Sequence, residues 1–189
     1  MDLRGQDDIL LAFRNDPRMM EILEAAQTLN LKDWWICAGF VRSKIWDIIH
    51  NFREPTRIDD VDVVYFDKTN TDKANEKGYE QKLKQILPSV PWSVKNEARM
   101  HLINGISPYT STQDAISKFP ETATALGLTF ANDGSLHLTA PHGVEDVLNV
   151  IVRPTPYFLE SSDRMRIYSR RLKQKNWKAT WNQVTYLVE

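Results

Sequence analysis

The segment Val61–Phe66 limits the possible folds most, because its β-branched and aromatic residues are typical of a buried strand. Two carboxylates, Asp60 and Asp62, stand at its start. Side chains at i and i+2 share one face of a strand and lie roughly 7 Å apart. Val64 and Phe66 continue the same face and are apolar. We therefore expect both acids at the solvated end of this strand.

Two carboxylates in this arrangement can hold divalent cations. Two-metal sites separate their ions by about 3.5–4 Å, and hard oxygen ligands suit Mg²⁺, or Mn²⁺ in its place. Mg²⁺ usually binds through one or two carboxylates together with substrate phosphates. The Asp-x-Asp spacing alone is common, however, and an acidic strand entrance or a turn containing Asp59 and Asp60 also explains it.

A glycine turn provides a second signal. The apolar run Trp34–Ala38 predicts a short buried strand that ends at Gly39, and apolar residues at helical spacing from Val41 predict a helix directly afterwards. Glycine lets a backbone approach phosphate closely, and a helix start directs N–H groups at an anion. Arg42 and Ser43 fall in the first turn, where both side chains can reach phosphate oxygens. Packing alone also explains many such junctions.

Taken together, the two signals fit a phosphate and a metal ion. Cys37–Ser43 resembles the glycine motif of the nucleotidyltransferases of the DNA polymerase β superfamily, with Ala38 at the place of the first glycine and Gly39 at the second. Asp60–Val63 resembles their acidic strand motif. Over roughly residues 20–185 the chain resembles a bacterial nucleotidyltransferase-like family, in the blocks Asp60–Asp67, Trp92–His101 and Pro120–Ala125.

The resemblance implies a fold and a reaction. A nucleoside monophosphate would pass from a nucleoside triphosphate to a hydroxyl acceptor, and pyrophosphate would be released. Asp60 and Asp62 would hold Mg²⁺ or Mn²⁺, and Gly39, Arg42 and Ser43 would bind the phosphates. The acceptor, whether a small molecule, RNA or protein, is left open, as are the base preference and the oligomeric state.

One position departs from the superfamily pattern, which usually places a third carboxylate on a later strand. The matching strand is Trp92–Asn96, with alternate residues facing the core, so that Ser93 and Lys95 face the site. Ser93 stands where relatives can carry an acid. Its presence puts turnover in question but not nucleotide binding, and Glu97 or Asp47 are possible substitutes.

Several residues near that strand have two interpretations. Lys95, Asn96 and Arg99 could contact phosphate or base, or could lie at the surface or cap a helix. The tail is basic and carries two aromatic residues, Tyr168 and Trp177. Such a surface can bind RNA, although a solvated cationic helix is the simpler explanation. The tail cations are Arg164, Arg166, Arg170, Arg171, Lys173, Lys175 and Lys178.

Two further functions therefore stay open beside the enzyme. One is a nucleotide-binding or regulatory module without turnover, and the other is an RNA-binding protein that acts through the tail. The formal net charge of −1 implies no general attraction to nucleic acid or membrane.

Strand and helix patterns mix without strict alternation along the chain. They favour an α+β fold, with a mixed sheet and helices packed on it, over a doubly wound parallel fold. We expect one domain over residues 1–189, ending in a basic helical segment over about residues 160–189. The single Cys37, the charged segment Met1–Asp8 and the lack of a long apolar run favour a cytoplasmic protein that does not enter membranes.

Overall fold

A computed structural model describes residues 2–187, and its fold is the predicted mixture of helices and a mixed sheet. Five strands run in the order β3-β2-β1-β4-β5. The pair β2–β3 is parallel, whereas the other three pairs are antiparallel. The strands are β1 (Trp35–Cys37), β2 (Val61–Tyr65), β3 (Trp92–Asn96), β4 (Gly127–Phe130) and β5 (Leu136–Thr139). The strand predicted to reach Phe66 thus ends one residue earlier.

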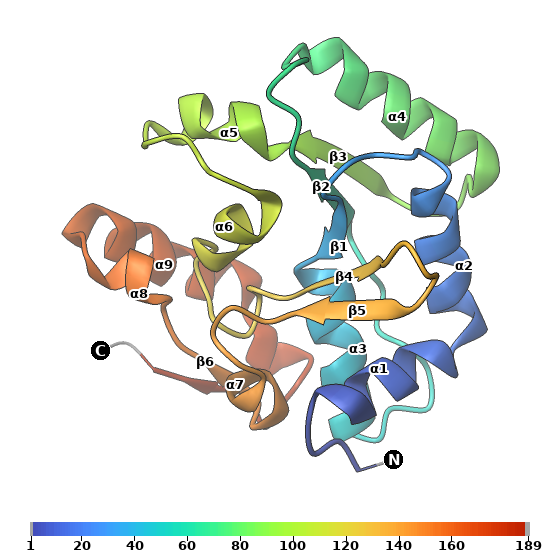
Figure 1. The fold of residues 1–189 in the computed structure, drawn as a ribbon. Coiled ribbons are helices and arrows are strands. Elements are labelled where there is room, and N and C mark those ends of the chain that lie inside the picture. The colour runs from blue at the N-terminus through green and yellow to red at the C-terminus, as the bar shows by residue number, and fades with distance from the viewer. Residues whose placement is uncertain (1, 188–189) are drawn as a thin grey trace.

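Helices lie on both sides of this sheet (Figure 1). Those from the N-terminal half lie against one side, and they are α1 (Gln6–Arg14), α2 (Pro17–Gln27), α3 (Gly39–Ile49) and α4 (Lys73–Ile86). On the other side lie α5 (Glu97–Asn104), α6 (Thr112–Ser117), α8 (Pro156–Leu159) and α9 (Ser162–Lys175). The short α7 (Glu145–Leu148) packs against α3.

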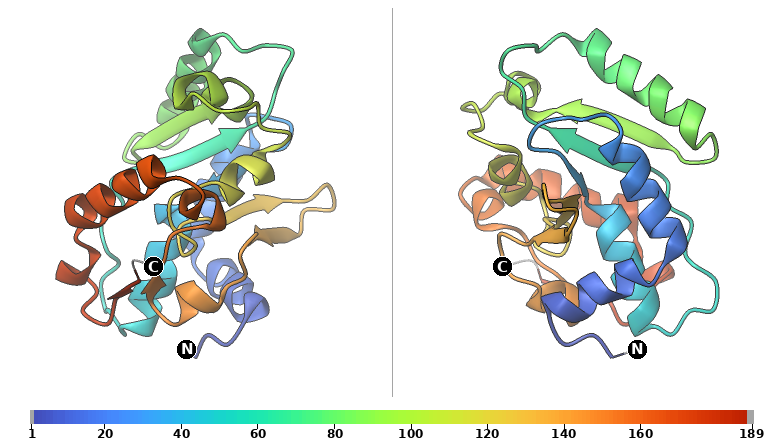
Figure 2. Two further views of the ribbon diagram at one scale, coloured as in Figure 1. Left: turned by 90° about the vertical axis from the view of Figure 1, so that its left-hand side faces the viewer. Right: turned by 45° about the vertical axis from the view of Figure 1, so that its right-hand side comes forward.

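Local chemistry sets several of these boundaries. The sequence Asn15–Asp16–Pro17, which is typical of a helix break, separates α1 from α2. The Asp16 carboxylate caps α2 by accepting from the N–H groups of Arg18 and Met19. The turn at Asp133–Gly134 joins β4 to β5 as a hairpin, which the sequence predicts, and it projects from the molecule in Figure 2.

The two faces of the sheet bury different clusters. The larger cluster lies between the sheet and α1–α4, and includes Val63 and Val94, both fully buried. The smaller one, on the opposite face, consists of Trp35, Cys37, Val64, Ile116 and Ala125. Asp62 and Ser93 share this second face, because side chains alternate along a strand. Polar groups are thus placed beside a small apolar patch.

The C-terminal segment is part of the core. Trp177 and Trp181 pack edge-on against Trp46 of α3, with ring centroids 6.1 and 5.2 Å apart. Strands β6 (Ile151–Val152) and β7 (Thr185–Tyr186) form a parallel pair that the sequence does not predict. Segment 162–187 therefore comes back to lie beside α3 (Figure 2).

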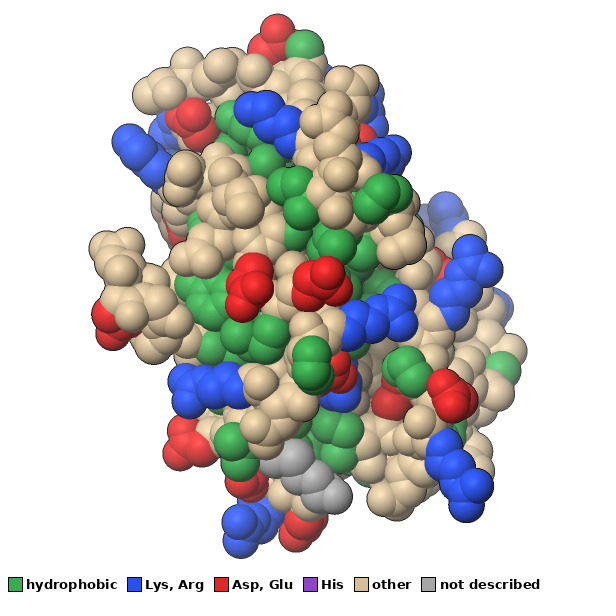
Figure 3. All heavy atoms as spheres, turned by 90° about the vertical axis from the view of Figure 1, so that its right-hand side faces the viewer, with side chains coloured by type: hydrophobic (Ala, Val, Ile, Leu, Met, Phe, Trp, Pro, Cys, Tyr) green, Lys and Arg blue, Asp and Glu red, His purple; other side chains and the backbone are tan. Residues whose placement is uncertain are grey.

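Within residues 2–187 every helix is too short or too polar to cross a bilayer. The face in Figure 3 intersperses Lys and Arg with Asp, Glu and hydrophobic side chains, in keeping with the near-zero net charge.

Candidate functional site

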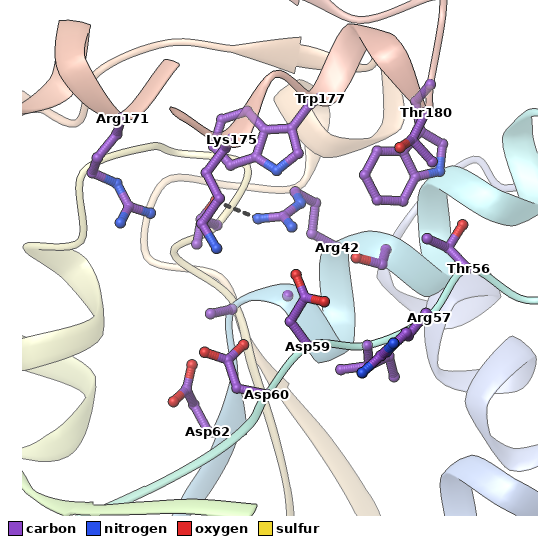
Figure 4. Close-up of a pocket in the computed structure, with 16 residues that line it drawn as sticks. Arg42, Thr56, Arg57, Asp59, Asp60, Asp62, Arg171, Lys175, Trp177 and Thr180 are labelled. Carbon is purple, nitrogen blue, oxygen red and sulfur yellow. Dashed lines mark hydrogen bonds between the residues drawn. The ribbon is translucent and has the colours of Figure 1, made fainter. Parts of the chain in front are cut away.

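A cavity of about 330 Å³ opens where the start of α3, the start of β2 and the end of α9 meet. It brings together Gly39, Arg42, Ser43, Asp60 and Asp62, which the sequence singles out from two separate segments (Figure 4). Its other lining residues are Ala38, Thr56, Arg57, Ile58, Asp59, Thr124, Arg171, Lys175, Trp177, Thr180 and Trp181.

In the turn before α3 the residue with a strained backbone is Ala38, not Gly39. Ala38 has φ +59° and ψ −122°, a region that favours glycine, whereas the φ of Gly39 is not positive. A Cβ atom built on Gly39 meets only Arg42 Nη2, at an ordinary 3.6 Å. The fold itself therefore does not require glycine at 39, and the missing side chain leaves room in the cavity.

The start of α3 offers backbone donors to that room. The Ala38 carbonyl accepts from the N–H groups of Val41 and Arg42, at 3.1 and 3.0 Å. Within residues 2–187 no side chain caps this helix start. Its first N–H groups thus remain available to an anion, with the positive end of the helix dipole behind them.

Arg42 is a buried cation that the surrounding residues hold in place. Its guanidinium carbon lies 5.2 Å from the ring centroid of Trp46 and 4.7 Å from that of Trp177, and Nη1 donates to Thr124 Oγ1 at 3.0 Å. Burial lowers its pKa to about 10, so it stays charged at neutral pH. Its Nε is buried and finds no acceptor within the described residues, which fits an anionic ligand.

The two carboxylates differ in exposure. Asp60 is exposed as expected, but Asp62 is partly buried and pairs with Cys37 on one side and Ser93 on the other. Burial first, and then the charge of Asp60, raise the pKa of Asp62 to about 6. A carboxylate whose charge is disfavoured by burial and by a neighbouring acid is suited to a divalent cation.

Among residues 2–187 no group of three or more His, Cys, Asp or Glu side chains is arranged to hold a metal. Asp60 and Asp62 would thus share a cation with the phosphates of a nucleotide, which is the usual way that Mg²⁺ binds beside a substrate.

The strand β3 is oriented as the sequence predicts. Trp92 and Val94 are buried in the larger cluster, and Ser93 lies across from Asp62 on the other face. No acid stands at that position. Asp47, one possible substitute, accepts from the N–H and O–H of Thr56 and from Trp181 Nε1, and so fixes the loop and tail instead.

Glu97 is a buried acid close enough to Asp62 for the two charges to interact. It begins α5 and is only 6% exposed. Burial, followed by the charges of Asp62 and Glu76, raises its pKa to about 7. Glu97 does not line this cavity, however, and among residues 2–187 it forms no three-carboxylate group with Asp60 and Asp62.

Three residues predicted to bind nucleotide, Ser93, Lys95 and Asn96, do not line the cavity. Asn96 is 1% exposed: its oxygen accepts from the N–H groups of Asp67 and Ala98, and its nitrogen donates to the carbonyls of Asp67 and Asn70. These hydrogen bonds cap α5 and hold the loop at residues 67–70, which favours the capping interpretation of Asn96 over a nucleotide contact. Lys95 lies 4.0 Å from Glu80.

The tail supplies cations that the sequence alone does not place in the site. Figure 4 shows Arg171 and Lys175 extending from α9 toward Asp60 and Asp62. Arg171 Nε donates to Glu121 Oε1 at 2.8 Å, and Glu121 is fully buried. The basic and aromatic residues of the tail are the sequence signal for this, but a solvated cationic helix is the simpler explanation of that pattern and an RNA-binding helix also fits it.

Comparisons with known proteins agree with this geometry. Residues 24–186 match a family described as Nucleotidyltransferase. A structure described as an NMR structure that reveals a CCA-adding enzyme head domain is 39% identical, has a TM-score of 0.87, and aligns over 98% of this chain and 97% of that one. The search of curated proteins finds no match.

More distant structures share the fold. A CCA-adding enzyme in complex with CTP is 11% identical, with a TM-score of 0.58 over 99% of this chain and 44% of that one. The Thermotoga maritima CCA-adding enzyme complexed with tRNA is 14% identical, with a TM-score of 0.53 over 97% and 42%. The chain thus spans less than half the length of these two enzymes.

Proposed function

Since the chain belongs to the nucleotidyltransferase family, we propose that it transfers a nucleoside monophosphate from a nucleoside triphosphate to an acceptor hydroxyl, with Mg²⁺ or Mn²⁺ on Asp60 and Asp62. This proposal rests on one observation, which is that two segments far apart in the sequence line the same cavity. The uncapped start of α3 meets the acidic start of β2 there, and four cations line the same space, namely Arg42, Arg57, Arg171 and Lys175.

The triphosphate lies along these cations and the N–H groups of α3. Asp60 and Asp62 would hold the divalent cation, which would supply neutralisation of the charge that develops on the phosphates during transfer. The acceptor oxygen forms a bond to the α-phosphorus, the bond from this phosphorus to the oxygen of the β-phosphate breaks, and pyrophosphate leaves. The hydroxyl proton passes to the Glu97 carboxylate, whose charge interacts with that of Asp62.

The acceptor is proposed as RNA first. The 39% identical protein is described as having a CCA-adding enzyme head domain, and a more distant enzyme of the same fold is complexed with tRNA. The cytosol supplies both RNA and triphosphates, and it would keep the lone, buried Cys37 reduced.

A nucleotide-binding module without turnover is the second candidate, and Ser93 favours it. The residue across from Asp62 is not an acid, so catalysis depends on Glu97 acting from the next element. Binding of triphosphate without any labelled product would support this candidate.

The test is a transfer assay with purified protein, each labelled triphosphate, Mg²⁺ or Mn²⁺, and either total RNA or a cell extract. We expect a labelled product whose formation falls at least about 100-fold in Asp60→Asn and Asp62→Asn, because each loses a ligand of the cation. Gly39→Val should lose triphosphate affinity with little loss of stability, since it fills the cavity but meets no backbone.

Asp7→Asn is the matched control, because Asp7 is exposed on α1 and lies outside the cavity. Unchanged product from both site variants would rule out the proposed role of these carboxylates.

A further inference from the structure

A second cavity, of about 520 Å³, lies between α5, the loop before α6 and the helices α8 and α9. It adjoins the proposed reaction site at two residues. Arg171 lines both cavities. Glu97 lines the second cavity, and its pKa is raised by the charge of Asp62 in the first. A molecule in the second cavity would therefore lie next to Arg171, which also lines the first.

The second cavity contains a flat cation on an aromatic ring. The guanidinium carbon of Arg164 lies 3.6 Å from the ring centroid of Tyr157. Its Nη1 donates to the Tyr157 carbonyl at 2.6 Å and to Glu160 at 3.0 Å, which fixes its plane. A guanidinium held flat in this way can stack on a further planar ring.

Charge and apolar surface in this cavity also suit one kind of ligand. Its lining includes three cations, Lys118, Arg164 and Arg171, but one acid, Glu97. Each cation is held by a carboxylate that does not line the cavity, at Asp114, Glu160 and Glu121. Met100, Ile103 and Ile106 supply an apolar wall. A ligand that carries both an anionic group and a flat ring would match the cations and the apolar wall.

We propose that the second cavity binds the acceptor, and that the reacting end of the acceptor is a nucleotide. Its base stacks on Arg164, its phosphate pairs with Lys118 or Arg171, and its hydroxyl reaches the α-phosphorus past Glu97. This assignment rests on the proposed transfer: the hydroxyl oxygen bonds to phosphorus, its proton goes to Glu97, and pyrophosphate leaves the triphosphate. A free mononucleotide and the 3′ end of an RNA present the same chemistry.

The test uses methyl NMR spectra of the full chain. The first cavity is saturated with Mg²⁺ and α,β-methylene ATP, and the protein is then titrated with AMP, CMP or a tetraribonucleotide. We expect saturable shifts at Met100, Ile103 and Ile106. Saturation by a mononucleotide identifies a free nucleotide as the acceptor, and saturation by the tetranucleotide alone identifies an RNA end.

Two variants probe the cavity itself. Arg164→Gln should weaken binding of the probe about tenfold or more, because it removes the stacking surface. Arg166→Gln is the control, since Arg166 lies on the same helix, pairs with Asp163 and does not line the cavity. Ile103→Trp should also block the probe, and Ile103 is 61% exposed, so a larger side chain needs no room in the core.

The outcomes separate this inference from the proposed function. If α,β-methylene ATP fails to bind near Gly39, the proposed function fails. If it binds but the probes cause no shifts at the apolar wall, or if Arg164→Gln and Ile103→Trp leave their affinity unchanged, the assignment of the second cavity is overturned.

Discussion

At position 38 the backbone takes a conformation that L-amino acids rarely adopt, with φ +59° and ψ −122°. Such residues cost on the order of 1–3 kcal/mol and occur mainly at functional sites. Ala38 ends the strand and aims the first turn of α3 into the cavity. Here a residue that tolerates the angle poorly is kept at the place where the resemblance predicts glycine.

Ala38→Gly should therefore stabilise the protein. Relief of strain exceeds the greater entropy of glycine in the unfolded chain by about 1 kcal/mol, or roughly 2–4 °C in Tm for a chain of this size. Thermal unfolding measures this. Ala74→Gly, at an exposed position in the helix α4, should have the opposite sign. Equal destabilisation by both variants would show that position 38 is not strained.

The buried acids give the stability a pH dependence. The folded-state pKa values of Asp62 and Glu97 are about 6 and about 7, above the ordinary 3.8 and 4.5. The folded state thus binds protons more tightly than the unfolded state, and stability falls as pH rises from about 4 to 7 in the absence of metal. Mg²⁺ should restore part of this loss.

Glu97→Gln should raise the Tm of the metal-free protein at pH 8 and flatten its fall between pH 5 and 8, by an amount on the order of 1 kcal/mol. Asp62→Asn should act in the same direction. Melting curves in EDTA at pH 5, 6, 7 and 8 measure both effects. If the Tm of both variants depends on pH in the same way as that of the wild type, the folded state does not raise the pKa of either acid.

At the scale of elements, the parallel register of β2 and β3 decides what can stand beside Asp62. Ser93 lies directly across from it, and neighbouring residues of β3 face the opposite side. Ser93→Asp should add a third ligand to the cation. We expect Mg²⁺ affinity to rise several-fold, and the metal-free Tm to fall, because a third acid then joins Asp62 and Glu97.

Calorimetric titration of Mg²⁺ in the presence of α,β-methylene ATP measures this gain. Ser93→Asn is nearly the same size and lacks the charge, so it should show no gain. If Ser93→Asp binds Mg²⁺ no better than Ser93→Asn, the cation does not lie at this point of the sheet.

The elements that sequence predicts well are those whose signals are local. The apolar run before Gly39, the alternation along Trp92–Asn96 and the break at Pro17 depend on neighbours in the chain, and the strand and helix assignments that rest on them are confirmed. The capping role of Asn96 was open from sequence, since a residue before a helix can cap it or face a ligand. Only its three hydrogen bonds to Asp67 and Asn70, together with the cap on Ala98, decide between the two.

At the scale of the whole molecule, the cavity is completed by contacts between distant parts of the chain. Arg42 lies between Trp46 and Trp177, and Arg171 is oriented by the buried Glu121. No local sequence pattern relates these positions. The sequence therefore reveals that the tail is basic, but not which part of the fold its charged side chains contact. The near-zero net charge gives no sign of this either, although six of the 24 Lys and Arg residues line the two cavities.

The most direct test of the account is a structure of the protein with Mg²⁺ and α,β-methylene ATP. The phosphates should lie against the start of α3 at Gly39 and near Arg42, and Mg²⁺ should touch Asp60 and Asp62 together with phosphate oxygens. A triphosphate bound elsewhere, or phosphates at α3 with the cation away from both carboxylates, would contradict the central claim that this cavity is a metal-dependent nucleotide site.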